Sequence, residues 1–89
     1  MRYTVLWLPK AESDLAEIWM RVPNPGVVAE AADRLDRALS EDPYRVGESR
    51  TGKRRIAHRL PLGVDFIVGD EDMVVVVTGV WYCSKPHRG

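Results

Sequence analysis

Two amphipathic helices separated by a short break constrain the fold of this chain more than any other feature. The break is Pro23-Asn24-Pro25-Gly26, in which Asn24 suits the N-cap of a helix and Pro25 suits its first position. Apolar residues recur at helical spacing on both sides of it: Ala11, Leu15, Ile18, Trp19 and Val22 before, and Val28, Ala31, Ala32, Leu35 and Leu39 after. So short a connection predicts an antiparallel helix hairpin over residues 9–42, which Pro43 ends.

Most of the remaining chain is typical of β-strands. We predict strands over residues 3–8, 53–60, 64–68 and 73–82, with a loop over 44–52 and turns over 61–63 and 69–72. The apolar run 74–77 has no polar alternation, which indicates a central strand covered on both faces. The order strand, helix, helix, strand, strand, strand predicts a single α+β domain over residues 1–89. The helix hairpin packs on one face of a small, mostly antiparallel sheet, and the other face is partly open.

The composition excludes several classes of protein. The one cysteine, Cys83, cannot form an internal disulfide, and no apolar run approaches the roughly 20 residues that a membrane helix needs. We therefore expect a soluble cytoplasmic chain with no membrane partner. Cys83 and His87 are too few ligands for zinc, so we expect no metal and no other cofactor. Trp7 and Trp19 are expected in the core.

Charge is distributed unevenly although the chain has no net charge. Residues 1–42 carry five basic and eight acidic side chains, whereas residues 43–89 carry eight basic and five acidic ones. Six of these basic residues lie within 45–59, beside one acid, Glu48. Such a stripe can face an anionic partner, either nucleic acid or an acidic protein segment, or it can be a solvated strand surface.

Three segments, in their order and spacing, resemble the RelE/ParE superfamily over nearly the whole chain. The resemblance lies in YTVLWLPKAESDLAEIW, in LSEDPYRVGESRTGKRRI and in LGVDFIVGDEDMVVVVTGVWY. It implies the toxin of a type II toxin–antitoxin module, with a cognate antitoxin as its partner. RelE-like members cleave mRNA in the ribosome without a metal, whereas ParE-like members inhibit DNA gyrase. A homodimer or a toxin–antitoxin hetero-oligomer is the assembly to expect.

Metal-free RNA cleavage needs groups that remove a proton from the ribose, hold the phosphate and protonate the leaving oxygen. The resemblance and the strand alternation together assign these tasks. On a strand, Arg55 and Arg59 share one face with Ala57, whereas Arg54 lies opposite with Ile56, His58 and Leu60. We expect the face with Ile56 and Leu60 to pack on the helices, which leaves Arg55 and Arg59 on the open face. The predicted catalytic residues are Arg55, Arg59, Tyr82 and His87, and the predicted RNA-binding residues are Arg50, Lys53, Arg54, Lys85 and Arg88.

The chain also departs from the ribonuclease pattern. Gly63-Val64-Asp65-Phe66 and Gly79-Val80 stand where ribonuclease members often carry arginines. We interpret His58 as a partly buried strand residue rather than a base. Trp81 and Tyr82 point to opposite faces, so that one is expected in the core and the other can stack on a base. Three hypotheses follow: an mRNA endoribonuclease, a gyrase inhibitor without chemistry of its own, and an inactive member that only binds its antitoxin.

Overall fold

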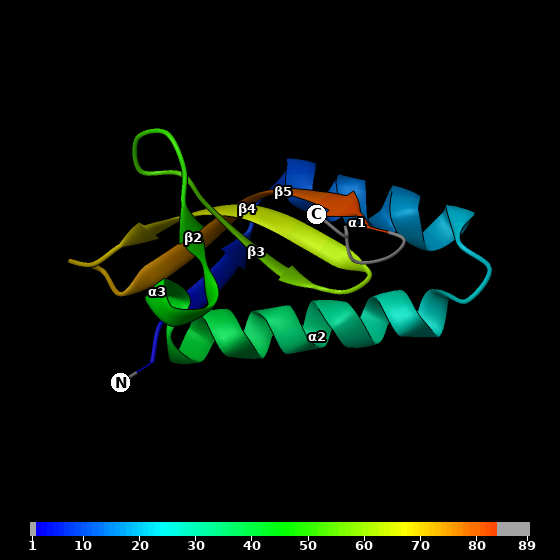
Figure 1. The fold of residues 1–89 in the computed structure, drawn as a ribbon, viewed down its shortest axis with the longest axis horizontal. Coiled ribbons are helices and arrows are strands. Elements are labelled where there is room, and N and C mark those ends of the chain that lie inside the picture. Colours follow the sequence, from blue (N-terminus) through cyan, green and yellow to red (C-terminus); the bar gives the residue numbers. More distant parts are fainter. Residues whose placement is uncertain (1, 84–89) are drawn as a thin grey trace, which may run out of the picture.

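A computed structural model describes residues 2–83. Two long helices, α1 (Pro9–Arg21) and α2 (Pro25–Glu41), are followed by a single turn of helix, α3 (Pro43–Val46). The strands are β1 (Thr4–Trp7), β2 (Glu48–Ser49), β3 (Arg55–Arg59), β4 (Leu62–Gly69) and β5 (Val74–Tyr82). Figure 1 shows the hairpin of α1 and α2, closed by a loop at the right of the view, with the sheet spread along its length. The predicted α+β class is confirmed, and the predicted elements occur in the predicted order with α3 and β2 inserted between α2 and β3.

Proline residues stand at the starts of the helices, as the sequence predicts for the first two helices. Pro9, Pro25 and Pro43 each stand in the first turn of a helix, where a missing backbone N–H costs nothing. Asn24 occupies the N-cap of α2, but its side chain makes no capping hydrogen bond. Pro43 begins α3 rather than a loop, because the Asp42 side chain caps that turn by accepting from the backbone nitrogen of Arg45 at 3.2 Å. The predicted loop over 44–52 therefore contains α3 and β2.

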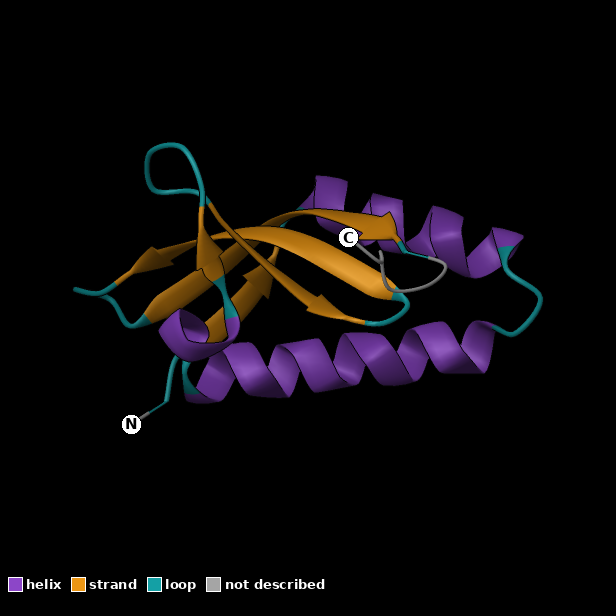
Figure 2. Cartoon of the chain, viewed as in Figure 1, coloured by secondary structure: helices purple, strands orange, loops and turns teal. Residues whose placement is uncertain are grey.

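The five strands form one sheet in the order β1-β5-β4-β3-β2. β1 runs parallel to β5, and the other neighbours are antiparallel. Figure 2 shows the strands fanning out across one another, as the right-handed twist of a sheet requires. An irregularity in the β4–β5 register at Asp65 and Phe66 adds to this twist. Among residues 2–83, β1 pairs only with residues 74–77 of β5, so the second half of β5 has an edge without a partner strand in this part of the chain.

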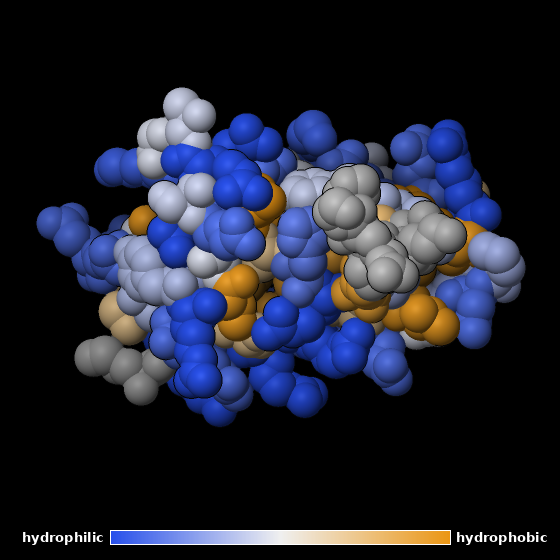
Figure 3. All heavy atoms as spheres, viewed as in Figure 1, coloured by the Kyte–Doolittle hydropathy of each residue, from blue (hydrophilic) through white to orange (hydrophobic). Residues whose placement is uncertain are grey.

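The hydrophobic core lies between both long helices and one face of this sheet. The helices contribute Ala11, Val28, Ala31, Leu35 and Leu39, and the sheet contributes Ala57, Leu62, Val64, Phe66, Val75, Val77 and Val80. Val74 and Val76 point to the opposite face and are only half-buried. The prediction that the run 74–77 is covered on both faces is therefore wrong, since no helix in residues 2–83 packs on its second side. Apolar side chains form separate patches on the mostly hydrophilic surface seen in Figure 3.

Two tyrosines fasten the end of the sheet near α3. The Tyr44 hydroxyl donates to both Asp70 carboxylate oxygens at 2.9 and 2.8 Å, and the Tyr3 hydroxyl donates to Oδ1 at 3.1 Å. The hydrogen bond to Asp70 raises the pKa of Tyr44 above its ordinary value. Burial, and then the same carboxylate, raises the pKa of Tyr3. The chain before β1, α3 and the β4–β5 turn are thus held at one point.

Across residues 2–83, none of the helices has the length and apolar character that crossing a membrane requires.

Candidate functional site

The uncovered face of the sheet carries the first candidate site, and the strand register fixes which residues occupy it. His58 and Trp81 are both paired with Gly63, one on each side of it. In an antiparallel ladder, paired residues point to the same face, so the two rings flank a position that has no side chain. Their centroids are 5.7 Å apart, and their planes are inclined by 80°. His58 is exposed and Trp81 is half-buried.

A salt bridge occupies the next row of the same face. Arg54 Nε donates to Asp65 Oδ1 at 2.7 Å, and the exposed fractions of the two side chains are 59% and 20%. Asp65 is paired with Ile56 on one side and Gly79 on the other, which places the pair two residues along the strands from His58 and Gly63. The hydrogen bond to Asp65 raises the pKa of Arg54, so the guanidinium stays charged. A cation, an imidazole and an indole therefore share this face.

The helix α1 closes the free edge of β5 beside this row. Asp14 accepts from the backbone nitrogen of Val80 at 3.3 Å and from Lys10 Nζ at 2.9 Å. The hydrogen bond from Lys10 lowers the pKa of Asp14, although its partial burial acts in the opposite direction. Asp14 is therefore a carboxylate that satisfies the strand edge, and it adds a negative charge near the Arg54–Asp65 pair.

An apolar row crosses the open face beyond the salt bridge. Leu6 and Ile67 both pair with Val76, and the exposed fractions of Leu6 and Ile67 are 50% and 38%. These side chains give that end of the face an apolar character. It suits a protein surface better than a phosphate backbone.

The predicted orientation of β3 is wrong, and this changes the roles of two arginines. Ala57 is buried against Val64 of the core, so Arg55 and Arg59, which share its face, lie on the helix side. Ala57 is small enough to fit beneath α2, whereas Leu60, expected to face the helices, is 40% exposed. The apolar signal of Ile56 and Leu60 misled the prediction, since Ile56 lies on the open face beside Asp65.

Arg55 fastens a loop instead of facing a substrate. Its Nη2 donates to the carbonyl oxygens of Tyr44 at 3.3 Å and Gly47 at 3.0 Å, and its guanidinium lies 5.0 Å from the centre of the Tyr44 ring. Its Nε is buried without a partner among the described residues. These contacts join β3 to α3, so that the structure does not favour the predicted catalytic role of Arg55.

The other two predicted catalytic residues on strands also lie away from the open face. Arg59 donates from Nη1 to the carbonyl of its neighbour His58 at 2.8 Å. Tyr82 pairs with Leu62 of the core and lines a small cavity of about 300 Å³ with Pro61 and residues of the α1–α2 connection. The side of the sheet that Tyr82 shares is thus that of the helices. The fourth predicted catalytic residue, His87, lies outside the described residues.

Of the predicted RNA-binding residues, only Arg54 lies in the group just described. Arg50 donates to Glu48 Oε1 at 3.4 Å, and Lys53 lines a cavity of about 500 Å³ together with the acidic turn Asp70, Glu71 and Asp72. Lys85 and Arg88 lie outside the described residues. The basic stripe is therefore not one continuous surface in residues 2–83, because carboxylates stand beside several of its members.

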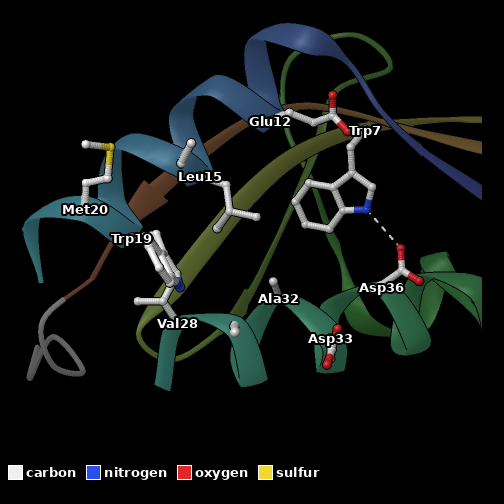
Figure 4. Close-up of a pocket in the computed structure, with 11 residues that line it drawn as sticks. Trp7, Glu12, Leu15, Trp19, Met20, Val28, Ala32, Asp33 and Asp36 are labelled. Atoms are coloured by element: carbon white, nitrogen blue, oxygen red, sulfur yellow. Dashed lines mark hydrogen bonds between the residues drawn. The ribbon is translucent and has the colours of Figure 1, made fainter. Parts of the chain in front are cut away.

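A second candidate site is an apolar groove between α1 and α2, with a volume of about 680 Å³. Figure 4 shows Leu15 and Trp19 of α1 pointing toward Val28 and Ala32 of α2, and Met20 also lines the groove. Trp19 and Met20 have exposed fractions of 50% and 78%, so the prediction that Trp19 lies in the core is wrong.

Carboxylates form the rim of this groove. Glu12, Asp33 and Asp36 line it, and Trp7 at its inner end donates from Nε1 to Asp36 Oδ1 at 2.9 Å (Figure 4). The groove thus offers apolar side chains along its length and negative charge along its border.

Sequence reasoning placed Arg54 and His58 on one face of the strand but assigned that face to the helices, and it did not bring Trp81 to them. A signal was available in the small residues: Gly63 and Gly79 face the same side as these residues, and Ala57 marks the covered one. Within residues 2–83, no three His, Cys, Asp or Glu side chains come together as a group that could hold a metal ion.

Comparison with known proteins identifies a structural relative. No protein-family model matches the sequence, and no curated protein matches it. Among solved structures, the chain is similar to one in the crystal structure of the RelBE2 toxin–antitoxin complex from Mycobacterium tuberculosis, with a TM-score of 0.76 and 27% sequence identity. The similarity covers 92% of this chain and 99% of that one. The resemblance to RelE-type toxins is confirmed, and the comparison supports a toxin role.

Proposed function

We propose that this chain is the toxin of a type II toxin–antitoxin module and that it cleaves mRNA on the ribosome. The observation that carries the proposal is the placement of Arg54 and His58 on the uncovered face of a RelE-like fold. Positions two residues apart on a strand are separated by about 7 Å. Arg54 binds Asp65, whose position in β4 is one such step from Gly63, the partner of His58.

The chemistry of this arrangement is that of internal phosphate transfer. The ribose 2′ oxygen loses its proton to the imidazole of His58 and bonds to phosphorus, while the bond from phosphorus to the 5′ oxygen breaks. Water supplies a proton to the 5′ oxygen, and the imidazolium of His58 then releases its proton to the solvent. The product strand ends in a 2′,3′-cyclic phosphate. Arg54 stabilises the charge that grows on the phosphate, because its terminal nitrogens are donors that the bond from Nε to Asp65 leaves uncommitted among the described residues. The participation of His87 stays a prediction.

The antitoxin is proposed to occupy the groove between α1 and α2. An amphipathic helix fits it, because its apolar side chains at helical spacing would cover Leu15, Trp19 and Met20. The carboxylates of Glu12 and Asp33 at the rim favour basic residues on the flanks of that helix. The RelBE2 neighbour is a toxin–antitoxin complex, which supports a partner of this kind.

The apolar row of the open face favours a second candidate function, the inhibition of DNA gyrase by binding alone. Leu6, Val76 and Ile67 form a surface that a protein partner would cover. In that case Arg54 and His58 make contacts but move no proton. The two functions differ in what the substitution of His58 does.

Growth and RNA assays of three variants test the proposal. Arg54→Gln and His58→Gln should both abolish growth arrest and the cleavage of mRNA on translating ribosomes, while Arg45→Gln, an exposed arginine on α3, should act like the wild type. Filamentation of the cells with induction of DNA repair, together with intact mRNA, would instead favour gyrase as the target. Growth arrest by His58→Gln with unchanged mRNA cleavage would overturn the role assigned to the imidazole.

A further inference from the structure

The indole of Trp81 lies across the backbone of Gly63. A Cβ atom placed on Gly63 would stand only 2.5–2.6 Å from Cε2, Cζ2 and Nε1 of Trp81, well inside the contact distance of carbon atoms. Glycine is therefore required there by the ring rather than by the backbone. Val80 and Tyr82, the neighbours of Trp81 in β5, pair with core residues and face the helices.

The imidazole of His58 completes a corner beside this indole. His58 stands on the opposite side of Gly63, and its ring is inclined by 80° to that of Trp81. One ring thus provides a surface over the strand, and the other provides a polar edge at its side. The Arg54–Asp65 pair lies in the adjacent row.

We propose that Trp81 and His58 form a nucleobase-binding subsite of the open sheet face. This inference rests on the proposed function, since it takes the ligand to be single-stranded RNA. A base stacks on the indole, which is tolerant of sequence because every base has an aromatic face. The imidazole nitrogen that does not take the ribose proton hydrogen-bonds to the edge of the base, and Arg54 contacts a phosphate one step away. The substrate class is therefore an unpaired RNA strand with at least one base turned toward the sheet.

Two matched single-stranded oligonucleotides, one complete and one abasic, separate base stacking from phosphate contacts. The full chain is titrated with a short single-stranded RNA and with the same strand carrying abasic residues, and binding is measured by fluorescence anisotropy. The wild type should bind the complete strand roughly 10-fold more tightly, which is the scale of one stacked base. Trp81→Ala should remove this preference and retain the binding of the abasic strand.

Gly63→Ala is the sharper variant, because it removes no charge and no aromatic ring. Its new methyl group should push the indole from the strand and lower the preference for the complete RNA to about 2-fold or less. Gly69→Ala is the matched control on the same strand, since a Cβ there meets nothing closer than the Val74 carbonyl at 3.8 Å, and its preference should stay at the wild-type value. Circular dichroism confirms that each variant is folded.

Different outcomes separate this subsite from the proposed function. If the wild type binds both RNA strands equally, or if Gly63→Ala keeps the full preference, the nucleobase subsite is wrong. Should that happen while the wild type cleaves mRNA on ribosomes, the ribonuclease proposal stands without the subsite. A base preference without any cleavage would retain the subsite and refute the ribonuclease. Binding of neither strand, with capture of an apolar peptide that Trp81→Ala loses, would assign the corner to a protein partner and overturn the inference.

Discussion

Replacing Arg55 by methionine should destabilise the fold by about 2 kcal/mol. The change removes two hydrogen bonds from Nη2 to the carbonyls of Tyr44 and Gly47, each worth about 1 kcal/mol. It also removes the contact of the guanidinium with the Tyr44 ring, worth about 0.5–1 kcal/mol. Removal of the buried Nε, which has no partner among the described residues, offsets about 1 kcal/mol of this destabilisation. Methionine retains the apolar stem, so that packing changes little.

Urea denaturation of the full chain measures this loss of stability. In thermal denaturation, the midpoint of the variant should be lower by roughly 10 °C for a domain of this size. Arg59→Met is the matched control on the same strand face, because its side chain bonds only to the neighbouring His58 carbonyl among the described residues. It should change the free energy of unfolding by less than about 0.5 kcal/mol. If Arg55→Met unfolds at the wild-type urea concentration and still loses toxicity, Arg55 contacts a ligand, and its role in joining β3 to α3 is refuted.

Three further results are expected. Asp65→Asn should raise the affinity for single-stranded RNA up to about fivefold, since an exposed ion pair with Arg54 holds at most about 1 kcal/mol; an unchanged titration would show that Arg54 does not meet phosphate. Trp19→Asp should fold normally and weaken antitoxin binding by roughly 30-fold in calorimetry, and unaltered affinity would move the partner away from the groove. Because the pKa of Tyr44 is raised, its hydrogen bond to Asp70 contributes stability below a pH of about 10, and this contribution is lost as the pH rises further. The urea midpoint should therefore fall less between pH 8 and pH 11 in Tyr44→Phe than in the wild type.

The helix hairpin could be predicted from sequence because its signals are local. Proline residues begin the helices, and the apolar stripes have helical spacing, so that Leu35 and Leu39 were assigned to the core correctly. Trp19 fits the same stripe but lies at its margin, where α2 leaves half of the side chain exposed. Periodicity gives the face of a helix, and it does not give the width of the surface that a neighbouring helix covers.

The face of β3 that packs on the helices could not be predicted, because the larger apolar side chains of the strand lie on the opposite face. Ile56 and Leu60 are larger than Ala57, yet the space beneath α2 accepts only the small side chain. Arg55 then lies at the end of the sheet, where its long side chain reaches α3 carbonyls. Such a position depends on α3, which the sequence did not predict.

The two candidate sites lie on different sides of the sheet, and this bears on how an antitoxin could silence the toxin. The groove lies between the helices, whereas Arg54, His58 and Trp81 lie on the uncovered face. A helix bound in the groove does not touch that face, because the sheet separates them. The α1 side is also closed, since Asp14 is bonded to the free edge of β5. If the open face carries the ribonuclease site, we expect the antitoxin to inhibit it with a second segment. The β2–β3 side is one route to that face, since β2 spans only two residues and leaves the rest of the β3 edge without a strand among the described residues.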